Sequence, residues 1–85
     1  MVDDQGPDIV HEGPKTIYAQ IVDYVAAHIE SGDWQPGHRL PSERDMAESW
    51  GVAYLTIRRA MKELRKKGLI VSVQGRGTYV KDPKD

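Results

Sequence analysis

The first half of the chain carries apolar residues at the spacing of an α-helix. Apolar side chains recur every four residues at Ile17, Ile21, Val25 and Ile29. This period gives a helix one apolar face that packs on a core. Gly32 lies just beyond the last of them, and glycine is favoured where a helix ends in a left-handed residue. The pattern therefore predicts a first helix that begins near Ile17 and ends at Ser31-Gly32-Asp33.

Two further helices are predicted, and a very short turn joins them. Ser42 followed by Asp45 is typical of a capped helix start, and the glycines Gly51 and Gly68 mark two helix ends. The apolar positions between these signals are Met46, Ala47 and Trp50 in one segment, and Ile57, Ala60, Met61 and Leu64 in the other. Only residues 51–53 separate the two segments, which is the spacing of a helix-turn-helix.

The last third of the chain predicts a β-hairpin. Residues 69–73 and 78–80 are rich in β-branched side chains, and the loop Gln74-Gly75-Arg76-Gly77 lies between them. Upstream, Pro36-Gly37 is typical of a type II turn and leads into a short stretch, residues 39–41, that can form an edge strand. The predicted fold is mainly α with a small β-hairpin: a winged helix-turn-helix of three helices plus a wing.

The two ends of the chain lack this pattern. Residues 1–14 hold four acidic side chains, no basic one and only three apolar residues after Met1, which is too little to offset the entropy of ordering. We therefore predict a disordered acidic tail over 1–14, a winged helix-turn-helix domain over 15–81 and a C-terminal tail over 82–85.

Composition limits the chemistry that the chain can support. A chain of 85 residues buries one thin core and has no room for a deep catalytic cleft. It contains no cysteine and only three histidines, and none of them has metal-ligand spacing, so we expect no enzyme activity, no metal and no cofactor. His28 and His38 are expected to be solvated, and Trp34 and Trp50 to join the core. No signal peptide or membrane span is apparent, which predicts a cytoplasmic protein.

The distribution of charge along the chain indicates what the domain binds. The net charge is −1, yet residues 52–81 hold eight basic side chains against one acidic residue, Glu63. On the third predicted helix the face opposite the core carries Leu55, Arg59, Lys62 and Lys66, with Arg58 and Arg65 on one flank. A basic helix of this kind fits the major groove of duplex DNA, where arginine can bond guanine O6 and N7. Arg76 in the hairpin loop can reach a phosphate or the minor groove.

Many residues from Gly32 to Val80 match the pattern of a known family. The matching positions are Gly32-x-Trp34-x-Pro36-Gly37-x-Arg39-Leu40-Pro41-Ser42-Glu43-Arg44, Ala47, Gly51-Val52, Thr56-Ile57-Arg58-x-Ala60, Leu64, Gly68-Leu69 and Gln74-Gly75-Arg76-Gly77-Thr78-Tyr79-Val80. They are similar to the DNA-binding domain of GntR-family bacterial transcription regulators over about residues 17–80. The resemblance implies that Glu43, Arg44 and Arg58 take part in operator recognition. It also implies that Tyr18 and Thr56 face phosphate, and that Gln74 and Gly75 reach the minor groove from the wing.

The chain departs from the family pattern in two ways. Where the family commonly has Ser-Arg-Thr, this chain has Ala53-Tyr54-Leu55, which removes a helix cap worth about 1 kcal/mol and an arginine expected to read guanine. Leu55 can instead contact a thymine methyl group, and Tyr54 a phosphate or a base edge. Family members usually continue into an effector-binding and dimerising domain, whereas this sequence ends five residues after Val80. It is therefore either a short regulator or a fragment, with no evident small-molecule effector site.

We interpret the chain as a sequence-specific, double-stranded DNA-binding transcriptional regulator, a repressor in preference to an activator, associated with the cytoplasmic nucleoid. The expected DNA-binding residues are Tyr18, Glu43, Arg44, Tyr54, Leu55, Thr56, Arg58, Arg59, Lys62, Gln74, Gly75 and Arg76. We expect a monomer or weak dimer in solution and a dimer on an operator. Two alternatives stay open: a protein-interaction winged helix that docks through Tyr54 and Leu55, and a small RNA-binding module.

Overall fold

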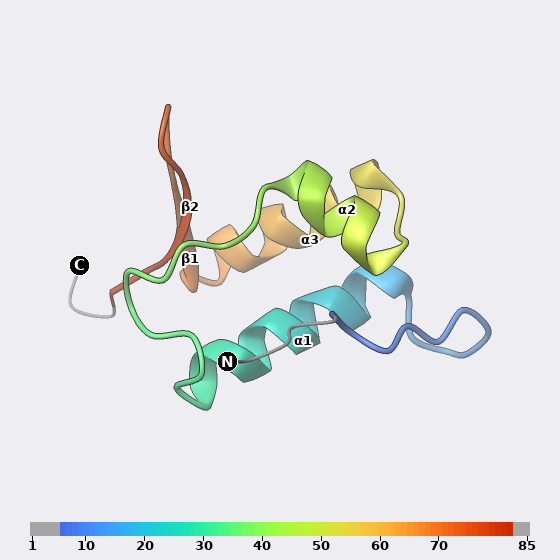
Figure 1. The fold of residues 1–85 in the computed structure, drawn as a ribbon. Coiled ribbons are helices and arrows are strands. Elements are labelled where there is room, and N and C mark those ends of the chain that lie inside the picture. The colour runs from blue at the N-terminus through green and yellow to red at the C-terminus, as the bar shows by residue number, and fades with distance from the viewer. Residues whose placement is uncertain (1–5, 83–85) are drawn as a thin grey trace.

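A computed structural model describes residues 6–82 of the chain. Its elements are α1 (Ile17–Glu30), α2 (Glu43–Trp50), α3 (Tyr54–Lys66), β1 (Ile70–Val73) and β2 (Gly77–Val80). Figure 1 shows α1 along one side of the molecule, α2 and α3 on the other, and the β1–β2 hairpin projecting beyond the helices at one end. This arrangement confirms the predicted winged helix-turn-helix. Within the described range, no helix is long and apolar enough to cross a membrane.

The helix ends follow the capping residues. The Ser42 hydroxyl accepts a hydrogen bond from the Asp45 backbone N–H at 3.0 Å and starts α2. Gly51, with φ of 64°, ends α2 in the left-handed conformation that an L side chain rarely adopts. At the start of α3, Ala53 takes the cap position but offers no side-chain acceptor. The expected loss of that cap is therefore confirmed.

One apolar core holds the three helices and the hairpin together. α3 packs against α1, α2 and β1, so it is the central helix of the domain. The buried apolar residues are Ile21, Val22, Val25, Trp34, Leu40, Met46, Trp50, Ile57, Ala60, Met61, Leu64, Ile70 and Val80. All four apolar positions predicted to face the core from α3 are among them.

β2 forms hydrogen bonds along both of its edges. On one edge it pairs antiparallel with β1, from Ile70 opposite Val80 to Val73 opposite Gly77. On the other edge, the Val80 N–H donates to the His38 carbonyl and the Leu40 N–H donates to the Thr78 carbonyl, each at 2.9 Å. The edge strand expected at residues 39–41 is thus reduced to a single bridge, between Arg39 and Tyr79. These bonds fix the wing to the segment that leads into α2.

Trp34 anchors the loop between α1 and α2. Its ring stacks on His28 with a centroid distance of 4.6 Å and on His38 at 5.5 Å. The His28 Nδ1 also lies 3.1 Å from the Asp33 carboxylate. His28 is therefore half-buried and partnered, and the expectation that it is solvated is wrong. His38 is exposed, as expected.

The segment before α1 has no helix or strand in residues 6–15, yet it contacts the domain. The Val10 N–H donates to Gln20 Oε1 at 2.8 Å, and Gln20 Nε2 donates to the Val10 carbonyl at 2.9 Å. Ile9 packs against the core. Residues 1–5 of the predicted acidic tail and 83–85 of the predicted C-terminal tail lie outside the described residues, and the disorder of the acidic tail stays a prediction.

Candidate nucleic-acid interface

The exposed start of α3 and the first turn of α2 form a cluster of charged and aromatic side chains. Arg58 Nε lies 3.7 Å from Glu43 Oε1. The guanidinium carbons of Arg44 and Arg58 lie 5.9 Å and 6.0 Å from the centroid of the Tyr54 ring. Contacts between a cation and an aromatic face are favourable at this range. The cluster therefore brings together four of the twelve predicted residues, with Arg58 on the outer side of α3.

A second group joins α3 to the beginning of α1. The Arg59 guanidinium lies over the Tyr18 ring, 3.9 Å from its centroid. Thr56 and Arg59 line a shallow hollow together with Lys15, Thr16 and Tyr18. Arg59 and Lys15, whose ammonium pairs with the Asp23 carboxylate, lie near the N-terminal end of the 14-residue helix, and the partial positive charge of a helix N-terminus adds to theirs. This hollow suits a phosphate, the ligand that the family resemblance implies for Tyr18 and Thr56.

The exposed surface of α3 is apolar at the start of the helix and basic further along. Leu55 is 74% exposed and Tyr54 is 42% exposed, although both are large apolar side chains. Lys62 is exposed further along the helix. Solvent exposure of Leu55 gives no stability to the domain, so the residue is free to contact a partner.

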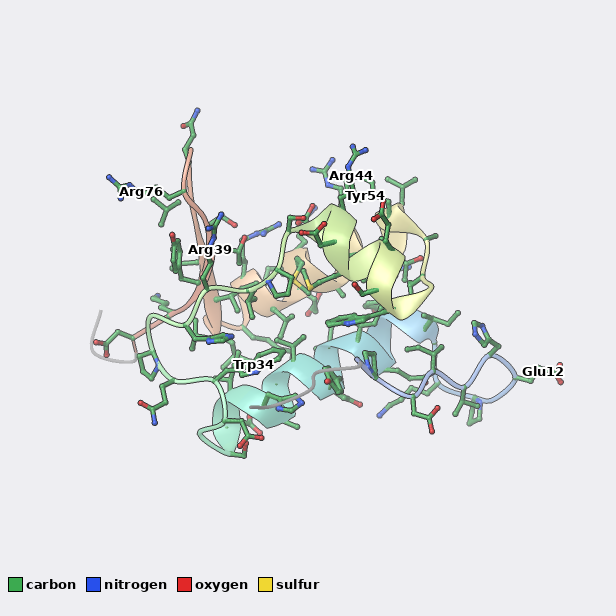
Figure 2. All side chains as sticks on the ribbon, in the orientation of Figure 1. Glu12, Trp34, Arg39, Arg44, Tyr54 and Arg76 are labelled. Atoms are coloured by element: carbon green, nitrogen blue, oxygen red, sulfur yellow. The ribbon has the colours of Figure 1, made fainter. Side chains whose placement is uncertain are left out.

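The predicted wing residues lie at the tip of the hairpin. Gln74, Gly75 and Arg76 form its exposed loop, and the Tyr79 hydroxyl donates to the Arg76 carbonyl at 3.2 Å. Figure 2 shows Arg76 near the end of the wing, on the same side of the molecule as Arg44 and Tyr54. The wing tip and the Arg44–Tyr54 cluster can therefore face one ligand together.

One basic side chain of α3, that of Arg65, links the helix to the wing. Arg65 Nη1 donates to the Ser72 hydroxyl at 3.0 Å, and that hydroxyl lies 3.3 Å from the Thr78 hydroxyl. These bonds connect α3 to both strands of the wing. Arg65 was expected on the flank of the basic face, and its contact with the wing depends on tertiary structure that spacing does not reveal.

Sequence reasoning missed Arg39 as a candidate site residue. Its side chain lies against Gly77 in the wing and lines a hollow with Ser42, Arg44 and Tyr54. In Figure 2 Arg39 lies between Arg76 on the wing and Arg44 and Tyr54 on the helices. One signal was available: Arg39 is the only lysine or arginine between residues 16 and 43. Over residues 6–82, no group of His, Cys, Asp and Glu side chains could hold a metal ion.

Comparison with known protein sequences gives consistent matches. The family described as "Bacterial regulatory proteins, gntR family" matches residues 17–80. The chain is 42% identical over 73 residues to the histidine utilization repressor of Pseudomonas putida, and covers 29% of that protein. It is 40% identical over 77 residues to the transcriptional repressor NagR of Bacillus subtilis, and covers 32% of it. These alignments include 86% and 91% of this chain, which spans about three tenths of the length of either relative.

Solved structures give the same picture. YtrA from Sulfolobus acidocaldarius, a GntR-family transcription factor, superposes with a TM-score of 0.82 at 40% identity, over 88% of this chain and 64% of that one. The DNA-binding domain of AraR in complex with operator ORX1 superposes with a TM-score of 0.74 at 33% identity, over 87% of this chain and 95% of that one. Both likenesses extend over most of the residues described above.

Proposed function

This chain belongs to the gntR family of bacterial regulatory proteins, and we propose that it is a domain that binds double-stranded DNA in a sequence-specific way and represses transcription. The observation that carries the proposal is the placement of Arg44, Tyr54 and Arg76 on one side of the molecule. It is supported by the operator complex of the AraR domain and by relatives that are named repressors. The family is one of regulators, so the chain is not an enzyme.

We assign a mode of binding from this geometry. α3 enters the major groove, where Arg58 and Arg44 bond base edges and Leu55 contacts a thymine methyl group. The loop of Gln74, Gly75 and Arg76 lies over the adjacent minor groove, whose negative potential attracts arginine. The remaining predicted residues serve the backbone or support the readers: Tyr18, Glu43, Tyr54, Thr56, Arg59 and Lys62.

We extend the proposal to the cell and to assembly. A regulator of this kind acts on the chromosome, so we place the protein in the cytoplasm, associated with the nucleoid. On an operator we expect two copies on two half-sites, because a single small module buries limited surface. We propose no small-molecule effector for the described residues.

Selection of bound duplexes from a random pool, followed by titration at several salt concentrations, tests the function. If about four to six phosphates are neutralised per copy, log K should fall with log salt at a slope of about −4 to −5. A slope near zero would contradict DNA binding and favour the protein-interaction alternative. Effective competition by duplex RNA would favour the RNA-binding alternative, because a helix does not enter the narrow major groove of RNA.

A further inference from the structure

The backbone of Arg39 is paired with β2, and its guanidinium forms no ion pair among the described residues. Its backbone bridges to Tyr79 of β2, and its guanidinium lies against Gly77. A Cβ atom on Gly77 would lie 2.9 Å from Arg39 Nε, so a side chain at that position would displace the guanidinium. Of the three ion pairs found among the described residues, none includes Arg39. The arginine is exposed and keeps its charge for a ligand.

Arg39 lies between the two parts of the molecule that are proposed to contact DNA, the wing and the helix-turn-helix. Its hollow is lined on one side by Gly77 and Thr78 of the wing and on the other by Ser42, Arg44 and Tyr54 of the helices. In duplex DNA a sugar-phosphate strand always separates a major groove from the adjacent minor groove. If α3 occupies one groove and the wing tip the next, that strand must cross the molecule between them, which is where Arg39 lies.

We propose that Arg39 binds a phosphate of the strand that separates the major-groove contact of α3 from the minor-groove contact of the wing. The inference rests on the proposed function, and it names a DNA-contacting residue outside both the helix-turn-helix and the wing. A guanidinium offers parallel N–H donors that match two oxygens of one phosphate, and it remains charged at any physiological pH.

Its position makes Arg39 a backbone contact and not a base reader. Base edges are reached from within a groove, and the major groove is about 8.5 Å deep. Arg39 belongs to neither α3 nor the wing tip, because it precedes α2 and pairs with the middle of β2. A residue between two grooves meets phosphate oxygens first. Phosphate contacts fix register and orientation without reading sequence.

The test compares Arg39→Ala and Arg39→Lys with the unaltered 85-residue chain, on the selected duplex and on a random duplex, across a salt series. Arg39→Ala should weaken binding about ten-fold on both duplexes, because a charge-assisted hydrogen bond is lost from each. Its salt slope should be shallower by about 0.9, the value for one phosphate. Arg39→Lys keeps the charge, so it should keep the original slope and lose less affinity.

A matched control removes a charge from a different place. Lys67, at the C-terminal cap of α3, is exposed and is not among the assigned DNA contacts, so Lys67→Ala should leave the slope unchanged. If the unaltered chain binds DNA but Arg39→Ala has no effect, or weakens only the selected duplex, the phosphate assignment is overturned while the proposed function stands. If the unaltered chain binds neither duplex, the proposed function itself fails.

Discussion

At the scale of single residues, Arg58 is held on the surface of α3 by a contact that DNA can replace. Its ion pair with Glu43 spans 3.7 Å, and the Arg58 side chain is 60% exposed. An exposed pair of this kind contributes about 0 to 1 kcal/mol. A bidentate bond to a guanine contributes about 1 to 3 kcal/mol of discrimination. Replacing the Glu43 contact of Arg58 by a bond to a base therefore favours binding only where the correct base is present.

We expect Arg58→Ala to cost about 1 to 3 kcal/mol on the selected duplex and little on random DNA, since it removes a base contact. Lys62→Ala, the comparison variant, should weaken both duplexes alike because it removes a phosphate contact. Titration of each variant against both duplexes measures the difference. Equal losses for Arg58→Ala on the two duplexes would show that Arg58 does not read a base.

The uncapped start of α3 gives a prediction about stability. Ala53 has the extended backbone of a cap residue, with φ of −59° and ψ of 139°, but no side-chain acceptor. Ala53→Ser supplies a hydroxyl that can accept a hydrogen bond from a backbone N–H of the first turn, so it should raise the free energy of unfolding by about 1 kcal/mol. Urea denaturation measures the change. Ala27→Ser, at an exposed position inside α1, has no such N–H to bond and should give no gain.

The residues that sequence predicts correctly are those whose roles are local. The core face of α3 and the Ser42 cap follow from spacing along a single element, and both are confirmed. Arg39 could not be assigned in this way, because Gly77, against which it lies, is 38 residues away in the chain. Arg65 and Ser72 likewise meet only after α3 and the wing have packed together.

At the scale of elements, the wing is attached to the body by two sets of bonds. The backbone of residues 37–40 pairs with β2, and the Arg65 side chain bonds the Ser72 hydroxyl of β1. A single hydrogen bond of this type contributes about 0.5 to 1.5 kcal/mol. Removing one should therefore loosen the wing locally and leave the helical core intact.

We expect Ser72→Ala to speed amide hydrogen exchange in β1 and β2 while exchange in the core of α3 stays unchanged. The substitution removes the acceptor of Arg65 and the neighbour of Thr78. Ser49→Ala, at an exposed position on α2, is the matched control and should change exchange in neither region. Faster exchange throughout the domain would mean that the wing and the helices unfold as one unit.

The helices and the hairpin are predicted well from the sequence, whereas the pairing of the segment before α2 with β2 is not. The three helices lie where the apolar spacing indicates, and the hairpin lies where the β-branched runs and the glycine-containing loop indicate. The pairing of residues 37–40 with β2 leaves no periodic trace, because only one bridge forms. Contacts of the segment before α1 also leave no trace in spacing: the Gln20 amide bonds the Val10 backbone, and Ile9 packs against the core.

At the scale of the whole molecule, most apolar side chains of the helices lie in one core. The large apolar side chains left exposed over residues 6–82 are Val10, Tyr54, Leu55, Val71 and Val73. Tyr54 and Leu55 belong to the proposed DNA interface, and the others are spread over two distant segments. Stable dimers usually bury about 800 Å² per partner with an apolar centre.

We therefore expect the 85-residue chain to sediment near its monomer mass of 9.6 kDa at micromolar concentration. On a palindromic duplex, binding should be cooperative, because two half-sites one helical turn apart hold two copies close together. A tight dimer without DNA would contradict this expectation. It would point to an interface formed by α1 or by the acidic segment that precedes it.

The pairing of β2 on both edges also affects the spacing of the two proposed DNA contacts, that of α3 and that of the wing. The 37–40 segment bonds to the backbone of Thr78 and Val80 in β2 and ends two residues before the Ser42 cap of α2, so backbone pairing links the wing directly to the helix-turn-helix. Inserting one base pair moves a contact by about 3.4 Å and rotates it by about 35° around the helix axis. Two contacts linked by backbone pairing are not expected to follow that combined shift and rotation. We therefore expect the number of base pairs between the proposed α3 contact and the proposed wing contact to be the same in every operator that the protein binds, which comparison of selected duplexes would check.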